Sequence, residues 1–228
     1  MDSSIYNRKK EFAEFMVRSG VLIFGDFTTK SGRRTPYFIN TGNYKTGSQI
    51  ARLGGFYAGC IKEQVKEPAT VIFGPAYKGI PLVVATAIAL ENQYHHSINY
   101  CFNRKEPKDH GEGGSIIGYQ LEDGDKVLIV EDVITAGTAV REILPLLKSV
   151  ADTDIVGMVL SVDRMERGQK NRTAIQELYE EYGIRTYPII SIREIVDILH
   201  NLEIDGKIAL GDDTKAKIET YLACYCVR

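Results

Sequence analysis

The sequence lacks an excess of charge of either sign. Its 28 lysines and arginines nearly balance its 30 aspartates and glutamates, which leaves a formal net charge of -2 at pH 7. A chain so close to neutrality has no overall electrostatic attraction for nucleic acid or for an anionic membrane. We therefore expect neither as a partner, and any anionic ligand must be held by a local site.

The sequence also lacks an apolar run that could cross a bilayer, which takes about 20 residues. Its most apolar stretch, 80–90, is shorter and is expected to form a buried helix. The N-terminus has no apolar segment behind its basic residues, so we expect no signal peptide. The four cysteines form no CxxC pair, and the spacing of Cys224 and Cys226 suits neither a zinc site nor an easy disulfide. These absences predict reduced thiols and a cytoplasmic location.

Repeats and low-complexity stretches are absent too, which excludes solenoids and propellers. Short β-rich runs alternate instead with longer helical patterns. Most of the runs are apolar throughout, as in strands covered on both faces, and they lie at 70–73, 97–102, 126–130, 155–162 and 187–190. Helices are expected at about 48–66, 80–91, 137–149, 171–182, 192–199 and 212–223. This alternation predicts a doubly wound α/β domain with a mainly parallel sheet, whose ligands bind at the carboxyl ends of the strands.

The strongest functional signal follows the run at 126–130. It ends in two adjacent carboxylates, Glu131 and Asp132, and a loop of small and hydroxylated residues then opens a helix. Residues 135–138 can place backbone N–H groups and two hydroxyls around a phosphate at the positive helix N-terminus. Carboxylates are wrong for phosphate but accept hydrogen bonds from sugar hydroxyls. The motif predicts a phosphorylated ribose along the strand tip; an acidic strand end with no ligand is the alternative.

Several other chemistries lack their motifs. The G-x-G-x-x-G dinucleotide fingerprint is absent, and Ile80 and Pro81 stand where a Walker A loop requires Lys-Ser/Thr. No GxSxG elbow supports acyl transfer. His95 and His96 have no carboxylate or cysteine at ligand spacing, so they are expected to be surface residues, and we expect no metal held by protein ligands alone.

Two more loops can handle phosphate. In residues 73–81, Gly74 and Gly79 permit a tight backbone, and Lys78 places a positive charge beside exposed amides. Residues 103–114 are charged and glycine-rich, which predicts a mobile lid whose cations neutralise a leaving group and exclude water. Taken singly, a structural turn with a solvated lysine and a solvated hairpin tip would explain these two segments as well.

The motifs together resemble a known family. Residues 131–139 are similar to the phosphoribosyl-pyrophosphate (PRPP) signature of the type I phosphoribosyltransferases, and residues 73–81 to the diphosphate-binding loop of that family. Residues 103–114, 22–40 and 161–168 resemble the catalytic loop, the N-terminal hood and the orotate-carboxylate segment of the orotate phosphoribosyltransferases. The resemblance covers about 12–221. Glu131 stands where Asp is frequent in the family, and Ile39 where a second Phe is common.

This resemblance implies one domain over residues 1–228: an N-terminal helix and hood at about 1–45, a core at about 68–200 and a C-terminal helix at about 201–228. The implied reaction transfers the 5-phosphoribosyl group from PRPP to orotate, giving orotidine 5′-phosphate and diphosphate in pyrimidine nucleotide synthesis. Mg²⁺ is the implied cofactor, held mainly by substrate oxygens and water. A homodimer is also implied, in which each lid serves the site of the neighbouring subunit.

The resemblance also implies roles for individual residues. Catalysis is expected of Lys105, Lys108, His110 and Asp132. PRPP is expected to contact Lys30, Tyr77, Lys78, Arg104, Lys105, Lys108, His110, Glu131, Asp132, Val133, Ile134, Thr135, Ala136, Gly137, Thr138 and Ala139. Orotate is expected to contact Phe38, Ile39, Thr135 and Arg164, whose guanidinium suits bidentate pairing with a carboxylate.

Two alternatives stay open at this point. A phosphoribosyltransferase for another base, such as a purine, would keep residues 131–139 but lack the hood and the Arg164 carboxylate partner. A non-catalytic regulator on the same fold that binds RNA or DNA would carry a basic face and lose the lid chemistry. The near-neutral charge and the lid composition oppose the regulator, whereas the hood and Arg164 oppose the purine enzyme.

Overall fold

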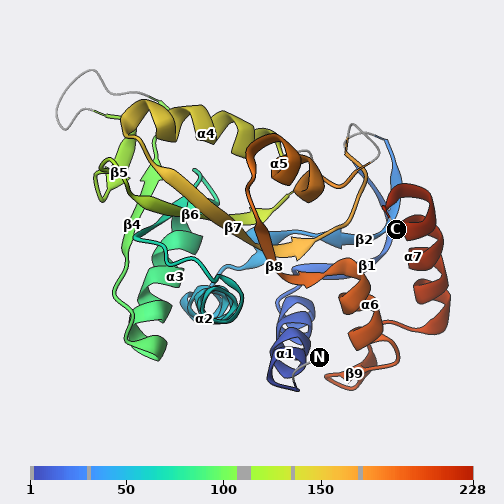
Figure 1. The fold of residues 1–228 in the computed structure, drawn as a ribbon. Helices are drawn as coiled ribbons and strands as arrows, with labels where there is room; N and C mark the ends of the chain where they lie inside the picture. Colours follow the sequence, from blue (N-terminus) through green and yellow to red (C-terminus); the bar gives the residue numbers. More distant parts are fainter. Residues whose placement is uncertain (1–2, 30–31, 107–113, 135–136, 169–171, 228) are drawn as a thin grey trace.

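The computed structural model describes residues 3–29, 32–106, 114–134, 137–168 and 172–227 (Figure 1). In this part of the chain the helices are α1 (Ser3–Arg18), the 3-10 helix η1 (Thr41–Asn43), α2 (Gly47–Gln64), α3 (Gly79–Tyr94), α4 (Thr138–Val150), α5 (Ala174–Tyr182), α6 (Ile192–Leu199) and α7 (Asp212–Tyr225). The strands are β1 (Leu22–Thr28), β2 (Arg34–Ile39), β3 (Val71–Gly74), β4 (Asn99–Asn103), β5 (Ile116–Gly118), β6 (Lys126–Val133), β7 (Asp154–Asp163), β8 (Thr186–Ser191), β9 (Glu203–Ile204) and β10 (Lys207–Ile208). None of the helices within the described ranges is both long and apolar enough to cross a membrane.

The central sheet has six strands in the order β5-β4-β3-β6-β7-β8. Neighbouring strands are parallel except for β4 and β5. Helices α4 and α5 lie on one face, and α1, α2 and α3 lie on the other (Figure 1). The predicted doubly wound, mainly parallel α/β fold is therefore confirmed. From β3 the chain builds outward to β4 on one side and to β6 on the other, so the topological switch point lies between β3 and β6.

The apolar runs form central strands because both faces of the sheet are covered. In β6, Leu128 and Val130 belong to the core beneath α2 and α3. Val127 and Ile129 point the other way, into the clusters under α4 and α5. Successive residues thus bury their side chains on opposite faces, which requires a continuous apolar run rather than an alternating one.

The end of β6 and the start of α5 differ from the ends predicted from the sequence, and each difference has a local cause. Strand β6 continues to Val133 instead of ending at residue 130, because Glu131 still pairs with β7 and Val133 does so opposite Val162. The acid pair therefore lies inside the last part of the strand. Helix α5 begins at Ala174 rather than 171, since Thr173 caps it by accepting a hydrogen bond from the backbone N–H of Gln176.

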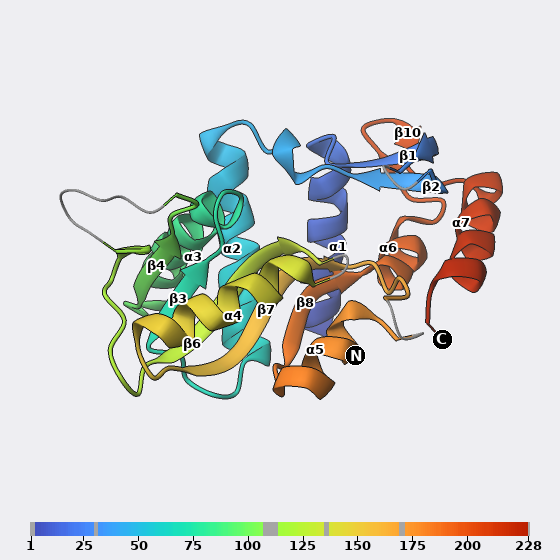
Figure 2. The ribbon, with the colours of Figure 1, turned by 90° about the horizontal axis from the view of Figure 1, so that it is seen from above.

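The N-terminal region forms a hairpin beside the C-terminal helix. Strands β1 and β2 pair in antiparallel fashion and lie close to α7, at the end of the molecule opposite β4 and β5 (Figure 2). The apolar stripe of α1 packs into the core through Phe12, Phe15 and Met16, and the Phe12 ring lies 4.9 Å from that of Phe56 in α2. The stripe is thus buried within the chain itself, except for Tyr6, which is 46% exposed.

Candidate functional site

The segments singled out from the sequence meet at one edge of the sheet. Strands β3, β4, β6 and β7 are parallel neighbours in the order β4-β3-β6-β7, so the loops that follow them leave the sheet at the same edge. The pair β3 and β6 flanks the switch point, where doubly wound sheets bind their ligands. Residues 75–78 connect β3 to α3, and the acid pair lies in the last part of β6, before Val133. The two motifs therefore face each other across the switch point.

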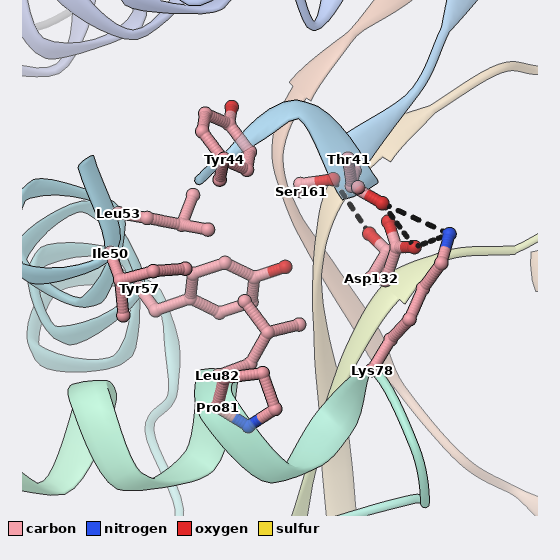
Figure 3. A pocket seen from close by; sticks show the side chains of 11 residues that line it. Thr41, Tyr44, Ile50, Leu53, Tyr57, Lys78, Pro81, Leu82, Asp132 and Ser161 are labelled. Carbon is pink, nitrogen blue, oxygen red and sulfur yellow. Dashed lines mark hydrogen bonds and ion pairs between the residues drawn. The ribbon is translucent and has the colours of Figure 1, made fainter. Parts of the chain in front are cut away.

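Asp132 is the centre of a polar contact across this point. Its side chain is only 7% exposed. Its Oδ2 accepts hydrogen bonds from Thr41 Oγ1 at 2.7 Å and from Lys78 Nζ at 2.8 Å (Figure 3). Lys78 Nζ also donates to Thr41 Oγ1 at 3.0 Å. Asp132 Oδ1 is buried with no donor among the described residues, and because an unpaired buried carboxylate oxygen is costly, it points to a donor supplied by a ligand.

Glu131 has an unusual ionisation. Burial raises the pKa of its carboxyl to about 7, and the charge of Asp132 adds to the rise. The hydrogen bond from the Asp132 backbone N–H to Glu131 Oε1, 2.9 Å long, and the charges of Lys78 and Lys105 oppose it. Near neutral pH this carboxyl therefore exchanges between an acceptor and a donor form, and both forms can pair with a hydroxyl.

Two hydroxyls fix the backbone that carries these acids. Tyr57 of α2 is fully buried, and its hydroxyl donates to the Glu131 carbonyl oxygen at 2.7 Å. Ser161 Oγ of β7 donates to the Asp132 carbonyl oxygen at 2.6 Å. Sequence reasoning assigned no role to Thr41, Tyr57 or Ser161. Only Ser161 lay in a quoted motif, and nothing in the local sequence of the other two marks them.

A cavity of about 140 Å³ adjoins Asp132. It lies between α2, α3 and η1, and its apolar wall includes Ile50, Leu53 and Leu82 (Figure 3). Pockets that enclose drug-sized ligands measure about 300–1,000 Å³. This cavity is therefore too small for a sugar phosphate, and a ligand of that size would lie on the open side of the acid pair.

The loop after β3 is held tightly against the start of α3. A Cβ placed on Gly79 would lie 2.6 Å from the carbonyl carbon of Gly74, so the two backbones touch and only glycine fits. Asn103, at the end of β4, accepts a hydrogen bond through Oδ1 from the Ala76 backbone N–H at 2.8 Å. The peptide bond between Ala76 and Tyr77 is cis. Lys78 and Tyr77 are displayed to solvent, with Tyr77 69% exposed.

Of residues 103–114, which the sequence predicts to form a lid, the structure describes 103–106 and 114. Arg104 donates its backbone N–H to the Ser115 carbonyl at 2.8 Å, and its Nε is buried without a hydrogen bond in the described part of the chain. Lys105 is exposed and acts electrostatically on Glu131. The charge of Lys105 therefore favours the ionised form of Glu131. Lys108 and His110 lie outside the described residues, as do Lys30, Thr135 and Ala136.

The helix after β6 presents its first turn to solvent. Gly137 caps α4 in the left-handed region, with φ 71°, and Thr138 and Ala139 are exposed. Ile134 instead points into the core with α4 and α5, so its side chain is not available to a ligand, and Val133 is half-buried. Residues 138–139 thus form an exposed first turn of α4, and backbone N–H groups in such a turn can bind an anion.

A second charged group lies at the end of β7. Arg164 Nη2 donates to Glu166 Oε1 at 2.6 Å, and its Cζ lies 5.5 Å from the centre of the Tyr37 ring. Tyr37 belongs to β2, so the hood strand that carries Phe38 and Ile39 passes next to this arginine. Phe38 is 42% exposed and Ile39 is half-buried. The structure thereby places β2 next to Arg164. Among the described residues, no group of three or more His, Cys, Asp or Glu side chains could hold a metal ion.

This chain is similar in sequence and in structure to known proteins. The phosphoribosyl transferase domain family matches residues 40–183. An orotate phosphoribosyltransferase from Clostridium beijerinckii is 54% identical over 217 residues, which are 95% of this chain and 97% of the relative. Another from Clostridium acetobutylicum is 53% identical over 220 residues, with 96% and 98% covered. The crystal structure of orotate phosphoribosyltransferase from Francisella tularensis superimposes with a TM-score of 0.81 at 36% identity and covers 95% of this chain and 99% of its own.

Proposed function

The chain belongs to the orotate phosphoribosyltransferases of the phosphoribosyltransferase family, and from this premise we propose how its residues divide the reaction. The enzyme transfers the 5-phosphoribosyl group from PRPP to orotate and releases orotidine 5′-phosphate and diphosphate, a step of pyrimidine nucleotide synthesis. The observation that carries the residue assignment is the buried acid pair at the switch point, with a guanidinium group at the next strand end.

We propose that Glu131 and Asp132 bind the ribose hydroxyls. Support comes from Asp132 Oδ1, which is buried without a donor, and from the backbone contacts of Tyr57 and Ser161, which hold the pair in place. Lys78 is 62% exposed and can leave Asp132 to meet the diphosphate without moving the carboxylate. Asp132 would then exchange a lysine donor for a hydroxyl donor.

The 5-phosphate is assigned to residues 135–138. The exposed first turn of α4 supports this placement, because backbone N–H groups at a helix N-terminus bind anions. With the phosphate at α4 and the ribose at the acid pair, the diphosphate would point toward residues 74–79 and the lid. Arg104, Lys105, Lys108 and His110 would then neutralise the departing diphosphate.

At neutral pH orotate is an anion through its carboxylate, and the ring nitrogen that attacks still carries a proton. As the N–C bond forms and the bond to diphosphate breaks, that proton would pass to water or to the departing diphosphate. The protein must hold the ribosyl carbon as positive charge develops on it, and it must exclude water while the bond to diphosphate breaks. Arg164 would pair with the orotate carboxylate, with Phe38 and Ile39 beside the ring. These contacts orient the nucleophile toward the ribosyl carbon.

We propose Mg²⁺ as the cofactor. The oxygens of the acid pair have the hard-donor chemistry that this ion prefers, and the unpaired Asp132 Oδ1 would fit a hydroxyl or water that the ion coordinates. Glu131 and Asp132 would hold the ion through such oxygens, with substrate oxygens as its main ligands. Once bound, it would neutralise charge on the diphosphate.

We also propose a homodimer in which the lid serves the neighbouring subunit. An apolar groove of about 520 Å³ between α2 and α3 offers part of an interface, with Ile80, Val84 and Ile88 on its wall. Ile88 is 55% exposed and adds to the apolar surface of this groove, and contiguous apolar surface marks interaction sites. Because α3 follows directly from residues 74–79, a subunit seated there would lie beside the site. A cytoplasmic location is proposed as well, supported by four cysteines that are all free thiols.

A spectrophotometric assay tests the function. Orotate loss is measured with PRPP and Mg²⁺, and uracil, adenine and hypoxanthine are run in parallel. Consumption of orotate alone, abolished by a chelator, is expected. Asp132→Asn serves as the matched variant, and its turnover should fall at least tenfold, because a hydrogen bond from a substrate hydroxyl to a charged acceptor contributes about 1.5–3 kcal/mol. Turnover of a purine in place of orotate would overturn the hood and Arg164 assignments.

A further inference from the structure

Glu166 joins three separate segments of the chain at the base-binding end of the site. Its side chain is 11% exposed. Oε1 accepts hydrogen bonds from Arg164 Nη2 at 2.6 Å and from the Tyr221 hydroxyl at 2.7 Å. Oε2 accepts from Arg33 Nη2 at 2.7 Å. The donors come from the segment after β7, from α7 and from the residues just before β2.

The C-terminal segment closes around the same group. The Arg33 guanidinium carbon lies 5.5 Å and 5.1 Å from the ring centres of Tyr221 and Tyr225. The Tyr225 carbonyl accepts from the Arg167 backbone N–H at 2.9 Å, and the Val227 N–H donates to the Met165 carbonyl at 3.1 Å. Two backbone hydrogen bonds thus attach residues 165 and 167 to the end of α7. They restrict the backbone next to Arg164.

The group carries one carboxylate for two guanidinium ions, so a positive charge is left over. The Nε atoms of Arg164 and Arg33 are buried and make no hydrogen bond with any described residue. Buried N–H groups are rarely left unpaired, and a charged one is costly to leave so. An acceptor with negative charge, such as the carboxylate of a bound base, would balance the remaining positive charge and would also accept from an unpaired N–H group.

We propose that Glu166 is a positioning residue for orotate: it holds Nη2 of Arg164 so that the remaining N–H groups of the guanidinium are set for the substrate carboxylate. The inference rests on the proposed role of Arg164. A preset guanidinium avoids the entropy cost of ordering a long side chain on binding. It therefore favours orotate over a base without a carboxylate, such as uracil.

Two substitutions separate positioning from charge balance. Glu166→Gln keeps the shape of the side chain and removes its charge, whereas Glu166→Asp keeps the charge and shortens the reach. If Glu166 only balanced charge, Gln would leave more positive charge at the site and lower the KM for orotate, and Asp would match the wild type. If Glu166 positions Arg164, both variants raise the KM for orotate about tenfold, the size of one charge-assisted hydrogen bond.

The measurements are the KM values for orotate and PRPP, kcat, and the ratio of orotate to uracil turnover, with a thermal melt of each variant. A change in the KM for orotate and in the ratio is expected, with the KM for PRPP within about twofold. Glu194→Gln is the matched control, because it removes the charge of another half-buried carboxylate, one that pairs with Lys9 and caps α6 instead of pairing with Arg164. Tyr221→Phe removes a single donor to Glu166 and should move the KM for orotate in the same direction by a smaller factor.

The outcomes are distinguishable. An Asp variant equal to the wild type, a Gln variant with a lower KM for orotate, or equal rises in both KM values would each overturn the inference. A wild-type protein that consumes no orotate would overturn the proposed function itself. Arg164→Ala tests whether Arg164 binds orotate at all. An unchanged KM for orotate in that variant would remove the assignment on which the inference rests.

Discussion

Replacing Glu131 by Gln should make the ligand-free protein more stable while it weakens PRPP binding. Gln keeps the shape of the side chain and an oxygen for the Asp132 backbone N–H, which Glu131 Oε1 accepts at 2.9 Å. The substitution removes only the ability of the side chain to ionise. The substitution therefore isolates the cost of holding a charge at the end of β6.

The size and sign of the effect follow from the pKa of Glu131, which burial raises from 4.5 to about 7. Between these two values the folded protein holds a proton that the unfolded chain has released. The stability linked to that proton is present below pH 4.5 and is lost as the pH rises through about 7. A shift of this size corresponds to about 3 kcal/mol as an upper bound. Glu131→Gln should thus be more stable than the wild type by about 1–3 kcal/mol at pH 8 and by little at pH 4.5.

Urea unfolding at pH 4.5 and pH 8 measures this difference, and Glu203→Gln, at an exposed position in β9, is the control for a change in net charge. The KM for PRPP should rise about tenfold in Glu131→Gln at pH 8, because a charge-assisted hydrogen bond to a hydroxyl is lost. In the wild type that KM should also rise as the pH falls below about 7, more steeply than in the variant. A stability gain that is the same at both pH values would refute the argument from ionisation.

Three further changes test the remaining parts of the site. Lys78→Ala should raise the KM for PRPP about tenfold with little change in Tm, because Lys78 is 62% exposed and the buried Asp132 Oδ2 keeps its hydrogen bond from Thr41 Oγ1; a large drop in Tm would contradict this. Gly79→Ala should lower the free energy of unfolding in urea by about 1–3 kcal/mol because of overpacking. Gly47→Ala should not destabilise the protein, because a Cβ at that position would have no atom within 4 Å. Mixing Lys108→Ala with Asp132→Asn chains should restore activity if the lid is shared, and hybrids that form without recovery would count against sharing.

The central sheet could be predicted because its strands are covered on both faces. The run at 126–130 is apolar in every position but its first, and only buried parallel strands require that. The sequence predicts an end of β6 that is too early, because polar residues at 131 and 132 are typical of a loop. Glu131 and Asp132 remain in the strand since pairing with β7 continues to Val133. Polarity at the strand end marks a site rather than the end of the pairing.

The residues that hold the site could not be predicted, because their contacts span long sequence separations. Tyr57 lies 74 residues from Glu131, and Thr41 lies 91 residues from Asp132. A tyrosine in an amphipathic helix and a threonine after a hairpin have ordinary local surroundings. Glu166 stood within a segment that resembles the family, but its partners Arg33 and Tyr221 come from opposite ends of the chain. Only the fold brings those donors to one carboxylate.

The two charged groups of the site are connected through a single strand pair. Ser161 of β7 donates to the Asp132 carbonyl, and three residues later the same chain carries Arg164. The spacing between the acids proposed to bind ribose and the guanidinium proposed to bind the base is therefore set by the parallel register of β6 and β7, in which Glu131 pairs with Leu160 and Val133 with Val162. A transfer between two bound substrates needs their reacting atoms about 3–3.5 Å apart. A pair of hydrogen-bonded strands can hold such a distance, whereas two independent loops would have to be ordered anew in each turnover.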